Sequence, residues 1–140
     1  MSTYAAEMDQ LIRNINSAIR KNGRIALQEY QITLVQFHAL LAIQEGPLTM
    51  GELCDALGVA SSTVTELVDR MEENGFVARV RDPEDRRMVR ILLLNHGKEI
   101  FEKVYKRREE FLAEALREMP EHDTCLLLEL LRKLNDAISS

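Results

Sequence analysis

The stretch Leu48–Asn95 constrains the fold more than any other part of the chain. Thr49 and Glu52 have the S/T-x-x-E spacing of a capping box, which predicts the start of a helix. Gly58 predicts the left-handed residue that ends this helix. A second helix is expected after a short turn and ends at Asn74-Gly75. The pattern therefore predicts two short helices separated by a tight turn.

The second of these helices has one apolar and one polar face. Its apolar residues recur at i, i+3, i+4 and i+7, which predicts a buried side; they are Val64, Leu67, Val68 and Met71. We expect Ser61 or Ser62 to cap its start. The polar face consists of Ser62, Thr63, Thr65, Glu66, Asp69 and Arg70. Such a face is typical of any solvated helix and also of a helix that contacts bases and phosphates.

Two segments that alternate in polarity, residues 76–81 and 88–94, predict a pair of strands. The turn between them places Arg86 beside Arg87 at its tip. An extended arginine suits a narrow minor groove, where the negative potential is enhanced. Asp85 could hold the guanidinium of Arg87 and lower the ordering cost on binding. A charged turn that only keeps the ribbon soluble is the alternative.

A helix-turn-helix followed directly by an arginine-tipped hairpin favours DNA binding over that alternative. In such a winged helix-turn-helix, the second helix enters the major groove. The net charge of −5 does not oppose this interpretation. Ten Lys and Arg against five Asp and Glu give residues 76–108 a net charge of +5, which leaves −10 for the remainder. A basic region on an acidic body is a usable electrostatic footprint for DNA.

Residues 59–75, VASSTVTELVDRMEENG, with Asp85-Arg86-Arg87 and a helix restart at Asn95, resemble the MarR family of bacterial regulators. The resemblance is strong from about Thr33 to Val104, and the flanking helices fit by pattern. It implies a minor-groove contact for Arg87. It also implies base contacts and phosphate contacts from the second helix, the former by Thr63, Thr65 and Arg70 and the latter by Ser61 and Ser62.

Two positions depart from the usual family pattern. Glu66 stands where a basic residue is frequent; its carboxylate can accept from cytosine N4 but repels phosphate. Asn95 stands where a threonine usually caps the helix after the wing, and asparagine caps as well.

Amphipathic helices are expected on both sides of this stretch. The first covers residues 8–30 and has a weak point at Asn22-Gly23 that could bend or break it. The next starts after Thr33, which has capping-box spacing with Gln36, and stops at Gly46-Pro47. Two more cover about 95–118, with an apolar side at Ile100, Val104, Phe111, Leu112 and Ala115, and about 123–138.

The last helix is apolar around much of its circumference, which predicts burial on more than one side. The resemblance implies a homodimer built from the first and last helices. We therefore predict a mostly α fold with a small β-wing. Residues 1–32 and 96–140 form a helical dimerisation region, and residues 33–95 form the winged helix-turn-helix domain. Two recognition helices about one DNA turn (~34–36 Å) apart would read a roughly palindromic site.

The sequence contains no apolar run long enough to span a membrane, and its start, MSTYAAEMDQ, lacks signal-peptide features. A cytoplasmic location is expected. Cys54 and Cys125 are expected to be reduced and to act as small buried hydrophobes. His38, His96 and His122 are scattered and form no metal-binding pattern, and no catalytic motif is present. We therefore expect no enzymatic activity, no cofactor and no metal.

An effector site is a weaker prediction. MarR proteins often bind anionic aromatic compounds between the dimerisation helices and the DNA-binding domain, and the resemblance implies such a ligand here. Tyr30, Phe37 and His38 lie near that junction in sequence, and Arg13 or Arg20 could meet a carboxylate. Ordinary core and surface positions are the alternative, because aromatic residues on apolar faces pack more often than they bind.

The predicted function is a homodimeric transcriptional repressor that binds double-stranded DNA and is modulated by a small molecule. Two alternatives stay open. The acidic net charge and Glu66 would suit a winged-helix module that binds protein. A thiol sensor would use Cys54 or Cys125.

Overall fold

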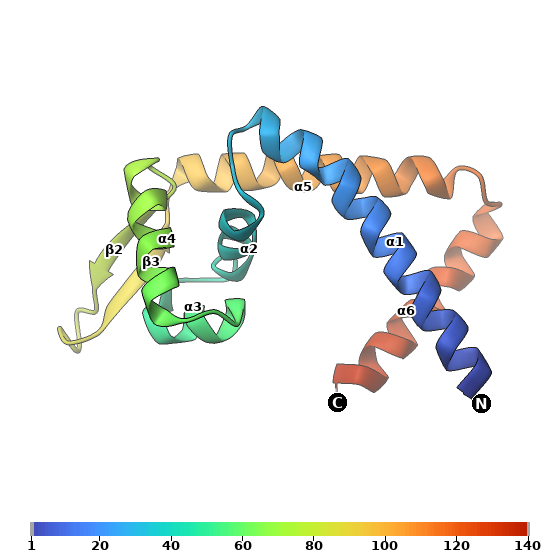
Figure 1. Ribbon diagram of the computed structural model, residues 1–140, viewed down its shortest axis with the longest axis horizontal. Coiled ribbons are helices and arrows are strands. Elements are labelled where there is room, and N and C mark those ends of the chain that lie inside the picture. The colour runs from blue at the N-terminus through green and yellow to red at the C-terminus, as the bar shows by residue number, and fades with distance from the viewer. Residues whose placement is uncertain (1, 140) are drawn as a thin grey trace.

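The computed structural model describes residues 2–139, which form six α-helices and three β-strands. The helices are α1 (Ser2–Glu29), α2 (Leu34–Ala42), α3 (Met50–Leu57), α4 (Ser61–Glu73), α5 (Asn95–Leu116) and α6 (Glu121–Ser139). The strands are β1 (Leu48–Thr49), β2 (Val77–Arg81) and β3 (Val89–Leu93). Helix α5 forms a spine, with α2, α3, α4 and the sheet near its first half and α1 crossing its second half (Figure 1). The predicted mostly α fold with a small β-wing is confirmed.

The sheet is antiparallel, with strand order β1-β3-β2. In the hairpin, Val77 pairs with Leu93 at the base and Arg81 pairs with Val89 nearest the turn. The prediction of a two-stranded ribbon was incomplete, because Leu48 of β1 pairs with Ile91 of β3. A two-residue strand is too short to show polarity alternation, which explains why the sequence did not indicate it.

The core lies between the C-terminal end of α1, α2, α3, α4, the sheet and the first half of α5. All four apolar residues predicted for the buried side of α4 are buried. Phe37 of α2 stacks on Phe101 of α5 with ring centroids 5.3 Å apart. Leu34 and Leu41 of α2 are 37% and 44% exposed. Apolar residues therefore occupy the exposed side of α2 as well as its buried side.

Both predicted capping boxes are present. The backbone N–H of Gln36 donates to Thr33 Oγ1 (3.1 Å), and that of Thr33 donates to Gln36 Oε1 (3.0 Å). Thr49 and Glu52 make the same reciprocal pair at the start of α3, with distances of 3.1 and 3.0 Å. Gly58 ends α3 with φ 66°, a left-handed conformation that favours glycine.

Other helix boundaries differ from the prediction. Neither Ser61 nor Ser62 caps α4: the N-cap is Ala60, which makes no side-chain hydrogen bond. Asn95 does not cap α5 either, because it is already the first helical residue. Helix α2 ends at Ala42, before Gly46-Pro47, since the chain already turns at Ile43. Helix α1 runs unbroken through Asn22-Gly23, where the helix hydrogen bonds tolerate one glycine.

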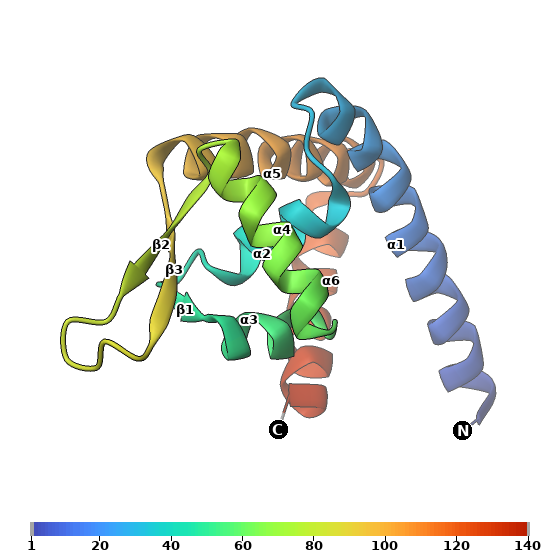
Figure 2. The same ribbon diagram turned by 60° about the vertical axis from the view of Figure 1, so that its left-hand side comes forward.

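Helices α1 and α6 leave large apolar surfaces uncovered. No described residue of α6 is buried. Figure 2 shows the N-terminal half of α1 standing apart from α6, and Figure 1 shows both helices on the side of the molecule away from α3, α4 and the hairpin. Exposed apolar side chains on these two helices include Met8, Leu11, Ile12, Ile15, Leu126, Leu127, Leu128, Leu130, Leu131, Leu134 and Ile138.

Several side chains predicted to be buried in this half of the molecule are not. In the second half of α5, Phe111 is half-buried, whereas Leu112 and Ala115 are exposed. Cys125 is exposed, whereas Cys54 is half-buried and packs against the core. The prediction for these positions assumed that another surface packs against them, and the single chain does not supply one. Among residues 2–139 no helix is long and apolar enough to cross a membrane.

Candidate DNA-binding interface

The polar face of α4 is open to solvent. Its predicted contact residues are all exposed; they are Ser61, Ser62, Thr63, Thr65, Glu66 and Arg70. The buried positions on the other side of α4 fix this orientation, because the helix packs against α3 and β2. The hydroxyl of Thr65 donates to the carbonyl of Ser61 (2.9 Å), so this hydroxyl is engaged within α4 itself.

The hairpin turn is organised by two aspartates. Asp82 Oδ1 accepts from the backbone N–H groups of Glu84 (2.8 Å) and Asp85 (3.4 Å). Asp85 Oδ1 in turn accepts from the backbone N–H (3.1 Å) and Nε (3.2 Å) of Arg87. The expected contact between Asp85 and Arg87 is therefore present, through one carboxylate oxygen. The Arg87 side chain remains 91% exposed, so its guanidinium is oriented and still free to bind.

Near its turn, the hairpin is tied to α3. Arg90 Nε donates to Asp82 Oδ2 (3.0 Å), and Arg90 Nη1 lies 3.7 Å from Glu52 Oε1. The backbone N–H of Glu84 and the Arg90 guanidinium hold the pKa of Asp82 below its ordinary value of 3.8. The capping hydrogen bonds from Thr49, with a smaller effect of Arg90, lower the pKa of Glu52.

Asp82 should give the hairpin a defined sensitivity to acid. Because folding lowers the pKa of Asp82, its contribution to stability is present above pH ~4 and is lost as the pH falls through the folded-state pKa. We expect Asp82→Asn to lower the thermal unfolding midpoint at pH 7, and to lower it by much less in acid, once the pH has fallen below the folded-state pKa of Asp82. Glu84→Gln is the control, because no side-chain hydrogen bond of Glu84 is found within residues 2–139. An equal deficit of Asp82→Asn at both pH values would contradict this account.

A second arginine of the ribbon, Arg79 in β2, contacts α4. Its Nη2 lies 2.7 Å from Asp69 Oδ1 and its Nη1 lies 2.6 Å from Glu72 Oε1. Its backbone N–H donates to Glu72 Oε2 (3.1 Å), and its Nη2 donates to the carbonyl of Thr65 (3.4 Å). Burial alone would lower the pKa of Arg79, but the hydrogen bonds to Asp69 and Glu72 outweigh it and raise that pKa. The N–H and guanidinium of Arg79 lower the pKa of Glu72.

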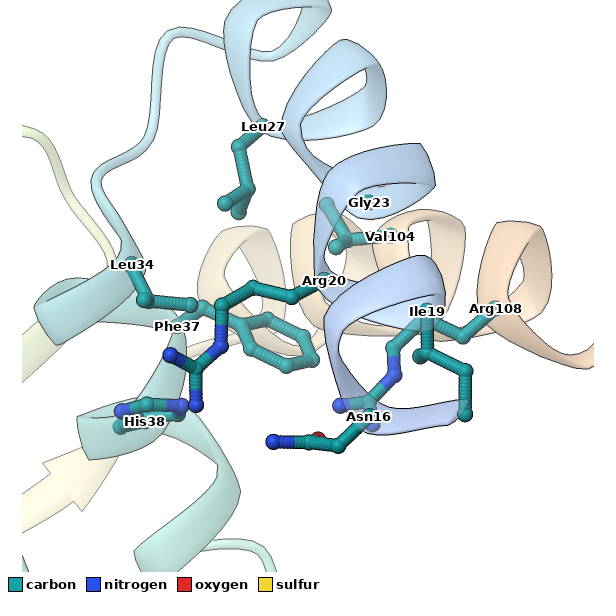
Figure 3. A pocket seen from close by; sticks show the side chains of 10 residues that line it. All are labelled: Asn16, Ile19, Arg20, Gly23, Leu27, Leu34, Phe37, His38, Val104 and Arg108. Atoms are coloured by element: carbon teal, nitrogen blue, oxygen red, sulfur yellow. The ribbon is translucent and has the colours of Figure 1, made fainter. Parts of the chain in front are cut away.

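A pocket of about 70 Å³ lies between α1, α2 and α5. Leu27, Phe37 and Val104 form part of its apolar lining, and Arg20, His38 and Arg108 are its basic residues. Figure 3 shows the Arg20 guanidinium extending from α1 towards His38 of α2. None of the described residues that line it is acidic.

The pocket is lined by three of the five residues that the sequence suggested for an effector: Phe37, His38 and Arg20. Arg13 lies outside it; it pairs with Asp9 (3.2 Å) and lines a second surface hollow formed by residues of α1. Tyr30 also lies outside it, with Lys103 Nζ 5.8 Å from its ring centroid. Arg20 does line the pocket, as the sequence suggested for a carboxylate contact.

Comparison with known proteins identifies the family. The sequence profile of the MarR family matches residues 30–88. YsmB of Bacillus subtilis, an HTH-type transcriptional regulator, is 38% identical over 132 residues, which cover 94% of this chain and 90% of YsmB. The chain belongs to the MarR family.

Solved structures of MarR proteins agree with this assignment. A MarR family protein from Bacillus stearothermophilus is 40% identical and superposes with a TM-score of 0.92, covering 100% of this chain and 99% of its own. NadR, solved in complex with 4-hydroxyphenylacetate, is 22% identical and has a TM-score of 0.70 over 91% of each chain, so it shares the fold. The chain is therefore a DNA-binding transcriptional regulator of the MarR family.

Sequence analysis of this MarR protein missed Arg79, Arg90 and Asp82 of the hairpin and Arg108 of the pocket as possible members of the site. The contacts of Arg79 had a detectable signal: Arg79 alternates in phase with buried Val77, so it lies on the inner face of β2. An arginine there needs acidic partners. Arg108 had no such signal, because its neighbour Phe37 is distant in sequence.

Proposed function

We propose that this MarR protein is a cytoplasmic repressor that binds a roughly palindromic operator as a homodimer. Helix α4 enters the major groove, and the hairpin tip enters the adjacent minor groove. Residues 33–95 serve as the DNA-binding domain, and residues 1–32 and 96–140 serve as the dimerisation region. The observation that carries this proposal is the tip, where Asp85 orients an almost fully exposed Arg87.

Each residue of the interface has a proposed contact. Ser61 and Ser62, at the start of α4, donate to phosphates, where the helix dipole favours an anion. Thr63 and Arg70 meet base edges, and Thr65 presents its methyl group to a thymine methyl, since its hydroxyl is engaged with α4 itself. Glu66 accepts from cytosine N4, a pairing that suits a carboxylate. Arg86 and Arg87 bind at the minor groove.

Replacing Arg87 by alanine should weaken operator binding by about 1–3 kcal/mol, the usual loss for a good groove contact. The measurement is a mobility-shift titration against a duplex selected from a random pool by the wild-type protein. Arg117→Ala removes the same charge at the far end of α5 and serves as the control, with an expected change within twofold. An unchanged affinity of the Arg87 variant would remove the hairpin from the interface.

We also propose that the pocket between α1, α2 and α5 binds an anionic aromatic effector. Arg20 and Arg108 supply positive charge, and Phe37 supplies an aromatic wall. Its present volume of about 70 Å³ is below the roughly 150 Å³ that holds a benzene ring. A ligand must therefore move α1 or α5 relative to α2. Such movement would couple effector binding to the spacing between the two α4 helices of the dimer. A ligand can shift this equilibrium only because its affinity differs between the two conformations.

The effector proposal predicts that 4-hydroxyphenylacetate lowers the affinity of the wild-type protein for the selected duplex. The amide of the same compound lacks the negative charge and should have no effect. Arg20→Met should abolish the response, whereas Arg24→Met, which removes a cation of the outer hollow on α1, should preserve it. Equal responses to the acid and the amide, or in the two variants, would contradict an anion site in this pocket.

A further inference from the structure

Arg79 is the only residue of β2 whose side chain forms ion pairs among residues 2–139, and both of its partners belong to α4. Its contacts follow one side of that helix over two turns, at Thr65, Asp69 and Glu72. Its own side chain is 28% exposed, whereas those of Asp69 and Glu72 are 56% and 37% exposed. The Arg79 side chain is therefore more buried than the two carboxylates that it contacts, and those carboxylates lie nearer the exposed surface of α4.

We propose that Arg79 is a positioning residue for DNA binding, which sets the hairpin relative to α4 and offsets part of the negative charge of the two α4 carboxylates. The proposal rests on the proposed function, because it assumes that α4 and the hairpin bind the same duplex. Arg79 does not itself contact DNA in this account; it acts through Arg87 and through the reading face of α4.

The positioning role follows from where Arg79 lies in the hairpin. Arg79 is paired with Ile91, which is 1% exposed, so this level of the sheet is fixed to the core. Beyond it, Arg81 pairs with Val89 and the chain turns. At ~3.4 Å per residue, Arg81 is already about 7 Å further out than Arg79, and the tip is further still. A small rotation at Arg79 thus becomes a larger displacement of Arg87.

The charge role follows from the exposure of the partners. Asp69 belongs to the polar face of α4 that is proposed to approach DNA, and a bare carboxylate there would repel phosphate. Arg79 places its guanidinium 2.7 Å from Asp69 and 2.6 Å from Glu72, so the pair of carboxylates carries a compensating cation. Glu66 has no ion-pair partner among residues 2–139 and therefore stays available as an acceptor from a base.

A brace that only stabilises the fold is the competing explanation, and a double-mutant cycle between Arg79 and Arg87 separates the two. The two residues make no contact with each other, so a purely stabilising Arg79 gives additive effects on operator affinity. The four proteins are the wild type, Arg79→Met, Arg87→Ala and the double variant. All are titrated with the selected duplex and checked for helix content by circular dichroism.

We expect Arg79→Met to raise the operator Kd by about tenfold, and the effect of Arg87→Ala to fall to within about twofold in its presence. The cycle is repeated with Arg117→Met in place of Arg79→Met, where the effect of Arg87→Ala should be unchanged. If Arg87→Ala costs the same factor with and without Arg79, the positioning role is wrong. If the wild type binds no duplex at all, the proposed function itself fails.

The double substitution Asp69→Asn/Glu72→Gln separates charge from geometry. It removes the same ion pairs without leaving bare carboxylates behind. It should abolish the coupling to Arg87 as Arg79→Met does, but with a smaller rise in Kd. An equal rise in the two proteins would contradict the charge role. Should Arg79→Met fail to fold, Glu72→Gln alone enters the cycle, and full additivity with Arg87→Ala would then overturn the proposal.

Discussion

Replacing Gly97 by alanine should lower the free energy of unfolding by about 3 kcal/mol, the upper end of the usual cost of overpacking. A Cβ atom at this position would lie 2.3 Å from the carbonyl oxygen of Phe76 and 3.0 Å from Leu93 Cδ1. The oxygen cannot simply move away, because it belongs to the backbone and accepts a hydrogen bond from the N–H of Leu94 (2.9 Å). Either α5 must shift away from the strand ends or this bond must break.

Gly23 provides a matched control. It is also a buried helical glycine, but no atom lies within 4 Å of the Cβ that alanine would add. Gly23→Ala should therefore stabilise the protein by up to about 1 kcal/mol through helix propensity. Thermal unfolding midpoints, measured at one protein concentration, check both predictions. Gly97→Ala should lower the midpoint by roughly 6–12 °C. A midpoint within 2 °C of the wild type would show that α5 can shift at little cost.

Gly97 also illustrates which features of the fold could be predicted from the sequence and which could not. Asn95-His96-Gly97 was predicted as a helix restart, and α5 does begin there. The reason for a glycine was not predictable, because it depends on the approach of Phe76, a residue of another segment. Capping boxes and the apolar spacing of α4 were predictable, since both are local: each depends on residues within one or two turns of helix.

In the candidate interface, too, some contacts were predictable from the sequence and others were not. The exposed hydroxyls of α4 and the contact between Asp85 and Arg87 follow from short-range patterns, and the structure contains both. The contacts of Arg79 with α4 and of Arg90 with Glu52 join separate elements, so no short-range pattern predicted them. The pocket combines residues from α1, α2 and α5; of the aromatic residues chosen for their sequence proximity to the junction, Phe37 and His38 line it and Tyr30 does not.

The uncovered apolar side of α6 leads to the prediction with the largest effect on DNA binding. The face centred on Leu127 and Leu134 is exposed in the single chain, where these two leucines are 38% and 40% accessible. An apolar surface of this kind, continued on α1, is typical of an interface between subunits. We expect a second copy to cover it, because a symmetric dimer buries the same surface of both chains at once.

Leu127→Glu/Leu134→Glu should therefore convert the protein to a monomer and weaken operator binding by about 100- to 10,000-fold, because the second half-site contact is no longer intramolecular. Arg132→Glu on the polar side of α6 changes the net charge by the same amount and should leave a dimer that binds normally. Sedimentation gives the mass, and mobility shift gives the affinity. A monomeric variant that still bound the full operator with wild-type affinity would show that one α4 helix and one hairpin suffice. A dimeric variant would place the subunit interface elsewhere than on α6.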